Sequence, residues 1–232
     1  MVVPGGVGGG VALVGRTLGP LEETAAELPV PTLPISADIT EDGAADLIFE
    51  TVERHWGPAG VVVSGAGGSF AAPLVETSDA DWDRMLAINL TAPFRLLRRA
   101  IPPMLDRGWG RFIVIASVVA KHGETQVSAY TASKHGALGL VRSAAAELAG
   151  TGITVNAVCP GWVDTPMTAE SVKAVAGRRG VSDEEAAALL ARRQPIGRLV
   201  RPDEVAAAVH ACAENAAING QGINVDGGAV QS

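Results

Sequence analysis

The sequence predicts a doubly wound α/β fold built on a parallel sheet, and three observations support this prediction. Short apolar runs rich in β-branched residues alternate with longer helical patterns. The apolar runs are continuous, which is typical of strands that helices cover on both faces. Hydrophobic residues make up 47% of the 232 residues and charged residues 19%, so a large core can be buried. Because neither a linker nor a repeat interrupts the pattern, we expect one domain over residues 1–232.

The elements follow from these patterns. We expect strands over 11–15, 32–38, 60–67, 111–117, 153–161 and 222–228. The intervening helices are one that ends near "AAELP", one over 42–56, one over 79–105 that Pro93 interrupts, and one that carries Tyr130. The long irregular segment 162–197 lies beyond a strand end, and we interpret it as a substrate lid. In such a fold the active crevice lies at the carboxyl ends of the strands.

Composition excludes several classes of function. The formal net charge of −7 argues against a nucleic-acid-binding surface. Cys159 and Cys212 stand far apart and in no metal-ligand spacing, so we interpret them as small buried residues in a reducing compartment. No apolar run reaches the roughly 20 residues of a membrane helix, and no charged segment precedes an apolar stretch at the N-terminus. We therefore expect a cytoplasmic protein that binds neither metal, membrane nor nucleic acid.

The stretch "SAYTASKHGALGLV" places Tyr130 and Lys134 one helical turn apart, on the same face of a helix. A nearby ammonium favours the phenolate and lowers the tyrosine pKa from about 10. Ser117, at the end of a buried strand, is placed to bond a carbonyl oxygen. Together these groups would hold a ketone and protonate its oxygen as a hydride reaches the carbon, or run the reverse. A lone Tyr-x-x-x-Lys is also common as a surface pair, so the pattern needs support from the rest of the chain.

That support comes from a series of motifs that resembles the short-chain dehydrogenase/reductase family over residues 11–230. The matching pieces, in family order, are "INL" with Asn89, "IVIAS" with Ser117, "YTASK", "VNAVCPGWVDTPM", "PIGR" and "NVDGG". The resemblance implies a Rossmann-like fold with Tyr130 as acid/base and Ser117 as the donor that orients the carbonyl. It also implies that Lys134 lowers the phenol pKa and binds the nicotinamide ribose, and that Asn89 holds a water in a proton relay. Asn89 has a structural alternative, which is to satisfy a helix kink beside Pro93.

The same resemblance implies a nicotinamide cofactor and residues that hold it. Asp38 would bond the adenine amino group with Ile39 beside it, although Asp38 could instead be an exposed helix N-cap. Small residues in "SGAG" would let the backbone approach the cofactor, but Ser64 and Gly65 depart from the family's Asn-Asn-Ala-Gly. Trp162 lines the substrate crevice or belongs to the core. The remaining implied cofactor contacts are Ala66, Gly67, Pro160, Gly161, Val163 and Thr165.

The end of the first strand bears on the choice between NADP(H) and NAD(H). An acidic residue there would bind the ribose 2′-hydroxyl and repel a 2′-phosphate. The sequence has Gly15 followed by Arg16 and Thr17, and a guanidinium without a carboxylate suits a phosphate. We therefore predict NADP(H) rather than NAD(H). The alternative for Arg16 is an ordinary solvated side chain.

The N-terminus departs from the family pattern. Family members open with a strand, a glycine-rich turn and a helix that together bind the pyrophosphate. Here only "MVVPGGVGGG" precedes "VALVG", which is too short for a crossover between adjacent parallel strands, so the first βα unit is shortened or missing. Three interpretations stay open. The given chain lacks about 15–20 residues of the natural protein; it is a natural truncation in which "MVV" pairs differently and cofactor binding is weak; or Gly5, Gly6, Gly8, Gly9 and Gly10 themselves bind the pyrophosphate.

The motifs "TGITVNAVCPGWVDTPM" and "PIGR" look most like 3-oxoacyl-thioester reductases and polyketide ketoreductases, which act on β-keto groups on coenzyme A or acyl carrier protein. The resemblance thus implies an NADPH-dependent ketoreductase for a small or carrier-bound carbonyl substrate. It also implies a homotetramer with the helix of Tyr130 and helix 79–105 at the contacts. The alternative is a catalytically silent scaffold. Two residue sets accompany these expectations. The first consists of lid cations that could attract anionic carriers or could simply lie on a solvated amphipathic helix pair (Lys173, Arg178, Arg179, Arg192, Arg193), and the second is a helix face suited to close packing (Ala137, Leu140, Val141, Ala144, Leu148).

Overall fold

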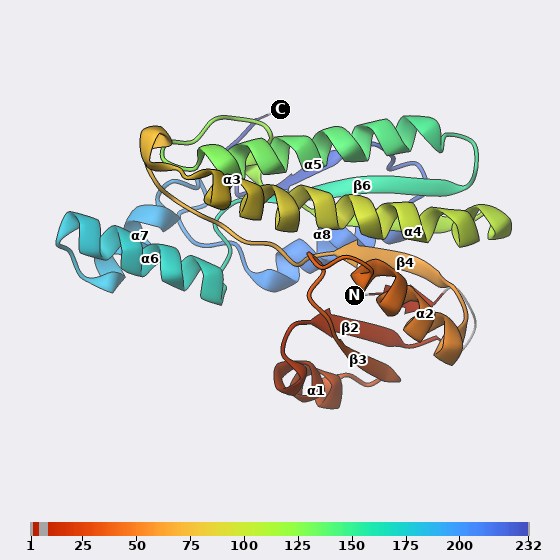
Figure 1. The fold of residues 1–232 in the computed structure, drawn as a ribbon. Coiled ribbons are helices and arrows are strands. Elements are labelled where there is room, and N and C mark those ends of the chain that lie inside the picture. The colour runs from red at the N-terminus through yellow and green to blue at the C-terminus, as the bar shows by residue number, and fades with distance from the viewer. Residues whose placement is uncertain (1, 5–8, 232) are drawn as a thin grey trace.

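The protein is described by a computed structural model that covers residues 2–4 and 9–231. A seven-stranded sheet in the order β3-β2-β1-β4-β5-β6-β7 forms its centre (Figure 1). The strands are β1 (Val2–Pro4), β2 (Val11–Gly15), β3 (Thr32–Ser36), β4 (Ala59–Ser64), β5 (Gly110–Ile115), β6 (Ile153–Pro160) and β7 (Gly222–Val225). Every neighbouring pair is parallel except the two that β1 forms, which are antiparallel.

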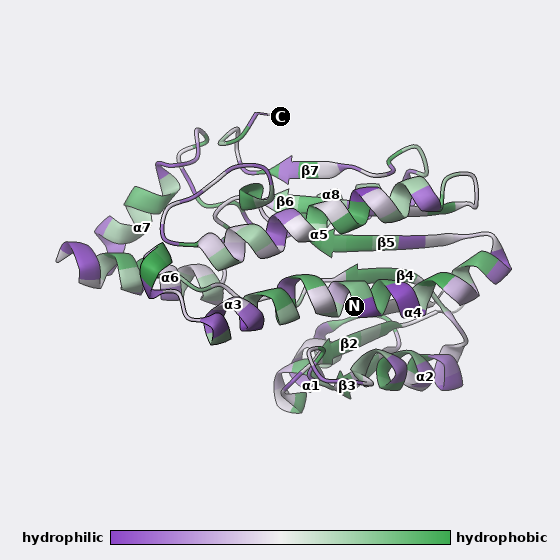
Figure 2. Ribbon diagram, turned by 45° about the horizontal axis from the view of Figure 1, so that its top comes forward, coloured by the Kyte–Doolittle hydropathy of each residue, from purple (hydrophilic) through white to green (hydrophobic). Residues whose placement is uncertain are grey.

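Helices cover both faces of the sheet, which confirms the doubly wound α/β fold. The helices are α1 (Leu18–Glu27), α2 (Ala44–Trp56), α3 (Asp79–Leu86), α4 (Ala92–Arg107), α5 (Ser128–Glu147), α6 (Pro166–Arg179), α7 (Asp183–Ala191) and α8 (Pro202–Glu214). Alternate residues of β5 point to opposite faces: Phe112 packs in the core beneath α2, α4 and α5, and Ile113 packs toward α8. Figure 2 shows the hydrophobic colours concentrated in the central strands, as the continuous apolar runs predict.

Several boundaries differ from the sequence prediction. Five strands, β3 to β7, end one to three residues early, because the chain beyond them turns into loops at the carboxyl edge. The predicted helix 79–105 is broken by a π-helical turn, η2 (Ala87–Thr91), just before Pro93. Pro93 has no N–H to donate to the carbonyl of Asn89, so the regular hydrogen-bond ladder cannot continue there. Helix α4 then runs through Pro102 and Pro103 to Arg107.

The segment 162–197, predicted to be irregular, is largely helical. It contains the α6–α7 hairpin (166–191), whose second helix begins with a capping box between Ser182 and Glu185. Val172 and Leu190 belong to a small hydrophobic cluster within the hairpin, and Trp162 packs against it from the end of β6. The prediction of an irregular chain was therefore wrong, whereas the alternative of a helix pair that carries the lid cations agrees with α6 and α7.

Strand β1 resolves part of the N-terminal question. It lies in the sheet between β2 and β4, but runs in the opposite direction, so its end at Pro4 pairs with Ala59 at the amino end of β4. Gly10 also lies at an amino end, that of β2, where a Cβ would collide with Pro31 and Trp56. The crevice opens at the opposite edge, so the interpretation of the glycine run as a pyrophosphate site is wrong for Gly9 and Gly10. Residues Gly5, Gly6 and Gly8 lie outside the described residues.

The alanine-rich face of α5 is closely packed, as expected. Ala137, Val141, Ala144 and Leu148 are buried in the chain's own core beneath the sheet, and only Leu140 stays partly exposed. The close packing of this face therefore takes place within the chain.

Two smaller predictions concern the cysteines and the membrane. Cys159 and Cys212 are buried thiols that form no disulfide. Within residues 2–4 and 9–231, none of the helices combines the length and hydropathy needed to cross a bilayer.

Candidate active site

The predicted catalytic residues come together at the carboxyl ends of β5 and β6. Ser117 lies just beyond β5 and begins the short 3-10 helix η3 (Val118–Ala120), where its Oγ accepts a hydrogen bond from the Val119 N–H at 3.3 Å. Tyr130 and Lys134 lie on the first turns of α5. The Nζ atom of Lys134 lies 5.7 Å from the centre of the Tyr130 ring. The two residues therefore share one environment, as the helical spacing predicts.

The electrostatics of Tyr130 differ from the sequence expectation. Burial raises the pKa of the Tyr130 hydroxyl, and the hydrogen bond with the Ser117 side chain opposes this shift. The net shift is therefore upward, opposite to the lowering expected from Lys134, whose ammonium donates to the carbonyl of Ile115 at 2.9 Å. The phenol is thus held in its neutral, proton-carrying form at neutral pH.

Lys134 is itself strongly perturbed. Its side chain is only 5% exposed, and burial lowers its pKa from 10.5 to about 8. The thiol of Cys159 acts on it in the opposite direction, and burial raises the pKa of that thiol. Lys134 therefore keeps its positive charge at neutral pH and loses it in mildly alkaline solution.

Asn89 connects the loop after β4 to α5. From the π-turn, its Nδ2 donates to the Gly68 carbonyl at 3.0 Å and to Ser133 Oγ at 3.2 Å, while its Oδ1 accepts from the Gly68 N–H at 3.2 Å. Ser133 Oγ in turn donates to the carbonyl of Tyr130 at 2.7 Å. The side chain is thus engaged in holding the loop, at the π-helical turn that interrupts the helix before Pro93. Asn89 therefore lies at the interruption of the helix, as the structural alternative expects. Its role in holding a water for a proton relay stays a prediction.

Two glycines lie where the cofactor was predicted, and other side chains pack closely against both of them. A Cβ on Gly67 would lie 3.0 Å from Asn89 Oδ1 and 3.6 Å from Lys134 Nζ, so no larger residue fits without displacing these groups. Gly161, which follows β6, is equally restricted, because a Cβ there would collide with Oε1 of Gln194. Pro160 is buried in β6, whereas Val163 and Thr165 are partly exposed in the loop that leads into α6.

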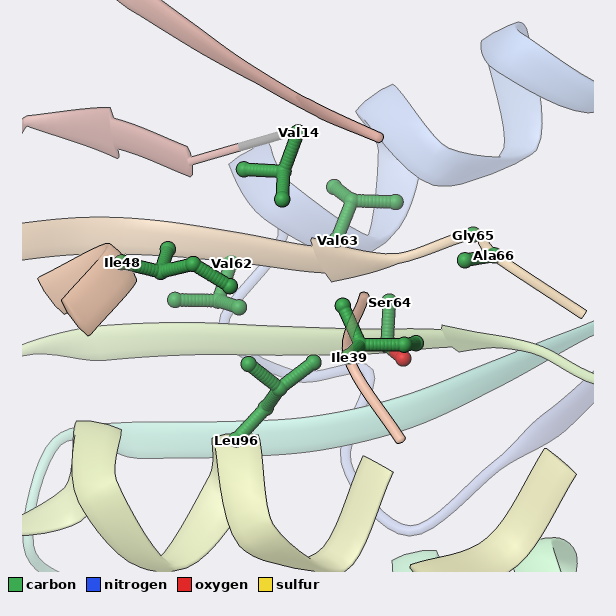
Figure 3. A pocket seen from close by; sticks show the side chains of 9 residues that line it. All are labelled: Val14, Ile39, Ile48, Val62, Val63, Ser64, Gly65, Ala66 and Leu96. Carbon is green, nitrogen blue, oxygen red and sulfur yellow. The ribbon is translucent and has the colours of Figure 1, made fainter. Parts of the chain in front are cut away.

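A small hollow of about 40 Å³ lies between the carboxyl ends of β2 and β4. Figure 3 shows Ile39 and Leu96 reaching toward it from the loop after β3 and from α4. Its lining is Val14, Ile39, Ile48, Val62, Val63, Ser64, Gly65, Ala66 and Leu96. The Oγ of Ser64 is buried there and forms no hydrogen bond with the described residues.

Asp38 and Arg16 lie at the rim of the same region. Asp38 Oδ1 accepts hydrogen bonds from the N–H and the hydroxyl of Thr40, at 2.9 and 2.6 Å. These bonds hold the pKa of the Asp38 carboxyl below its usual value, and the charge of Arg16 adds to the effect. Helix α2 is capped by Gly43, so the alternative of Asp38 as a helix N-cap was wrong. Arg16 is exposed at the end of β2.

Comparison with known proteins agrees with this geometry. A family model described as enoyl-(acyl carrier protein) reductase matches residues 8–230. A putative ketoacyl reductase of Streptomyces coelicolor is 42% identical over 186 residues, which are 78% of this chain and 71% of that protein. D-beta-hydroxybutyrate dehydrogenase of Cupriavidus necator is 37% identical over 83% of this chain and 76% of its own. The crystal structure of a point variant of actinorhodin polyketide ketoreductase with NADPH superimposes with a TM-score of 0.91 at 37% identity, covering 94% of this chain and 86% of that one.

The chain belongs to the short-chain dehydrogenase/reductase family. It is accordingly an oxidoreductase of a family whose members named here are dehydrogenases and ketoacyl reductases. As a short-chain dehydrogenase/reductase it has a Rossmann-like fold, in which β1 runs antiparallel to β2 and β4.

Sequence reasoning about this short-chain dehydrogenase/reductase missed two residues of the site. Ser133 lies inside the quoted "YTASK" motif and is fully buried between Asn89 and Tyr130. Gln194 precedes "PIGR" and is also buried, with its amide bonded to the backbone of Trp162. A polar residue within or beside a recognised motif was the only available signal for either.

The lid cations are divided between two environments. Arg178 donates to the side chain of Gln126 at 2.6 Å, and Arg193 forms an ion pair with Glu124. Both contacts join the segment 162–197 to the loop that precedes α5. The other three, Lys173, Arg179 and Arg192, are exposed.

Proposed function

We propose that the protein is an NADPH-dependent ketoreductase that reduces a ketone, such as a 3-oxoacyl thioester or a similar β-keto group, to a secondary alcohol, or catalyses the reverse. The observation that carries this proposal is the convergence of Tyr130, Ser117, Lys134 and Asn89 at the carboxyl edge of the sheet. These residues come from motifs as far as 45 residues apart in the sequence, and a surface pair would not be joined to the rest by hydrogen bonds.

The side chains divide the chemistry between them. A nicotinamide dinucleotide, when bound, supplies the hydride. Ser117 donates to the carbonyl oxygen and orients it, and Tyr130 gives its proton to that oxygen as charge develops there. Tyr130 is protonated at neutral pH, as the acid in the reduction direction must be. The charge of Lys134, 5.7 Å from the ring centre, stabilises the tyrosinate that remains.

Asn89 fits a proton relay through its main chain. Its side chain is occupied by Gly68 and Ser133. The main-chain carbonyl of Asn89, by contrast, lacks its regular helical donor. That donor would be the N–H of residue 93, and Pro93 has none. We propose that this carbonyl binds the water that returns a proton toward Lys134.

The residues present fit both ends of a dinucleotide. Gly67 and Gly161 lie on the nicotinamide side, where Asn89 and Gln194 pack against their Cα atoms, and Pro160, Val163 and Thr165 would complete that side. Ala66, Ile39 and Asp38 form the adenine side. The Oδ1 of Asp38 is bonded to Thr40, so Oδ2 would accept from the adenine amino group. The pyrophosphate lacks its usual partner, since no helix links β1 to β2 in the described chain.

Arg16 supports NADP(H) over NAD(H). It lies at the end of β2 with Thr17, and the hydroxyl of Ser36 on the neighbouring strand donates to its carbonyl at 2.9 Å. No carboxylate stands at the end of β2 itself. The guanidinium is therefore placed to bind a 2′-phosphate.

The α6–α7 hairpin would act as the substrate lid. A ketoacyl reductase is among the similar proteins, which favours a thioester substrate. The exposed Lys173, Arg179 and Arg192 would attract an anionic carrier.

The reduced, buried cysteines agree with a cytoplasmic location. We also propose a homotetramer, whose contacts would use outward residues of α4 such as Phe94, which is 41% exposed.

A fluorescence titration with NADPH followed by turnover assays tests this function. We expect saturable enhancement of nicotinamide fluorescence, and NADPH oxidation with at least one member of a panel of β-keto thioesters. NADH should bind more weakly. Absence of binding at millimolar NADPH would instead favour a catalytically silent scaffold.

A further inference from the structure

Gln194 forms a buried bridge between the α6–α7 hairpin and the loop after β6. The side chain is 1% exposed and follows the end of α7 by three residues. Its Oε1 accepts from the Trp162 N–H at 2.8 Å, and its Nε2 donates to the Trp162 carbonyl at 3.1 Å and to the Arg198 carbonyl at 2.8 Å. The amide thus pairs with both backbone groups of Trp162, much as a neighbouring strand would.

The segment that follows Gln194 continues this pairing. The Val200 N–H donates to the Trp162 carbonyl at 2.8 Å, and the Asp164 N–H donates to the Val200 carbonyl at 2.9 Å. Val163 and Val200 form an isolated parallel bridge. Gly161 accommodates Oε1 of Gln194 in the space that a Cβ would fill. The backbone from Gly161 to Asp164 is therefore shaped by Gln194 at one end and by Val200 at the other.

On the N-terminal side of Gln194, the chain connects directly to α7 of the hairpin. The preceding residue, Arg193, is ion-paired with Glu124 in the loop before α5. The Trp162 side chain packs against the hairpin cluster that contains Val172 and Leu190. A displacement of the hairpin would therefore act on the backbone of Trp162 through Gln194.

We propose that Gln194 is a positioning residue for the cofactor: its amide fixes the backbone of Trp162, keeps the loop Gly161–Thr165 in the shape that receives the nicotinamide, and couples that loop to the α6–α7 hairpin. The inference rests on the proposed function for the identity of the ligand. In this role Gln194 acts through the backbone of Trp162 and needs no contact with the cofactor. Its contribution is to remove alternative conformations of the loop before binding, and an ordered loop loses less entropy when the ligand binds.

The test compares Gln194→Met with a matched control. Methionine keeps the length of the side chain but removes the amide. The control is Asn156→Leu, since Asn156 in β6 is another fully buried amide that bridges backbone groups, donating to the Ile218 carbonyl at 2.7 Å and accepting from the Gln221 N–H at 3.0 Å. Both variants lose a buried amide of the same kind, but only Gln194 contacts the loop after β6. Two quantities are measured for each: amide hydrogen exchange at Trp162 and the dissociation constant for NADPH.

We expect Gln194→Met to speed exchange at Trp162 and to raise the NADPH dissociation constant by about tenfold, with a smaller change in kcat than in the cofactor KM. Asn156→Leu should leave both quantities within about twofold of the wild type at a similar loss of melting temperature. Equal effects of the two variants, or none in Gln194→Met, would overturn the proposal. If Gln194→Met does not fold, Gln194→Asn serves, because it keeps the amide but shortens its reach by one methylene.

The two proposals fail in different ways. A wild type that binds no NADPH would refute the proposed function, whereas exchange at Trp162 would still decide whether Gln194 sets the shape of the loop. Wild-type binding that Gln194→Met leaves unchanged would refute the positioning role alone.

Discussion

Lys134 lies beside Tyr130 with its Nζ 5.7 Å from the ring centre, yet it donates its hydrogen bond to the carbonyl of Ile115. The ammonium is therefore anchored to the end of β5, not to the phenol. The hydroxyl of Tyr130 instead has Ser117 as its partner. This division of contacts leaves the phenol neutral and the cation close by, which is what proton donation to an incoming oxyanion requires.

The first prediction concerns the pKa of Tyr130, which is the only tyrosine in the sequence. Ser117→Ala removes the hydrogen bond that opposes the effect of burial, so the pKa should rise further above 10. One ¹³Cζ-tyrosine resonance followed by NMR during a pH titration gives the value directly. Ser128→Ala is the matched control, because the Ser128 hydroxyl is buried two residues away but forms no hydrogen bond with the described residues. An unchanged or lower pKa in Ser117→Ala would contradict the assigned contact.

The second prediction concerns stability and pH. Because the pKa of Lys134 is about 8 when folded and 10.5 when exposed, the unfolded chain binds more protons between these values, so stability from this group rises with pH there. Below pH 8 the full cost of burying the charge, about 3 kcal/mol, is present. Lys134→Met should thus raise the free energy of unfolding near pH 7 by about 2 kcal/mol, after about 1 kcal/mol for the lost bond to Ile115. Denaturant titrations at pH 7 and 9.5 should show this gain shrinking, and a constant gain would contradict the lowered pKa.

The third prediction concerns cofactor choice. Arg16→Ala should raise the dissociation constant for NADPH by at least about tenfold and leave that for NADH within about twofold, since a single charged hydrogen bond to phosphate is worth about 1.5–3 kcal/mol. Arg54→Ala, an exposed arginine of α2 on the same half of the sheet, is the control and should change neither. Equal weakening of both cofactors in Arg16→Ala would show that Arg16 does not read the 2′-phosphate.

The fourth prediction concerns Ser64, whose Oγ is buried without a hydrogen-bond partner in the described chain. Burying an unpaired hydroxyl is costly, so Ser64→Ala should keep or raise the melting temperature, whereas most buried substitutions lower it. Thermal unfolding without cofactor measures the effect. A fall in melting temperature of several degrees would show that the hydroxyl has a partner in solution.

Much of the fold and site could be predicted because the decisive signals are local. Tyr130, Lys134 and Ser117 each stand in a short motif, and parallel strands bring their carboxyl ends to one edge. The path of the N-terminal segment was only partly predictable. Sequence length excluded a parallel crossover, but the antiparallel pairing of β1 with both β2 and β4 depends on contacts distant in the chain.

The remaining differences arise from burial and from long-range contacts. An i,i+4 spacing shows that a cation is near a phenol, but it does not show that desolvation outweighs that charge at Tyr130. The hydrogen bonds between Gln194 and the backbone of Trp162 join residues 32 positions apart, and nothing in either local sequence indicates the partner. The same holds for the pairing of Arg193 with Glu124 across 69 residues.

A comparison of wild type with Tyr130→Phe tests the central claim most directly, by single-turnover hydride transfer and NADPH titration on the same samples. The missing hydroxyl should slow transfer to a β-keto thioester by about 10³-fold and leave the NADPH dissociation constant within about threefold. Transfer that stays within about threefold of the wild-type rate would contradict Tyr130 as the proton donor, and with it the account of the site given above.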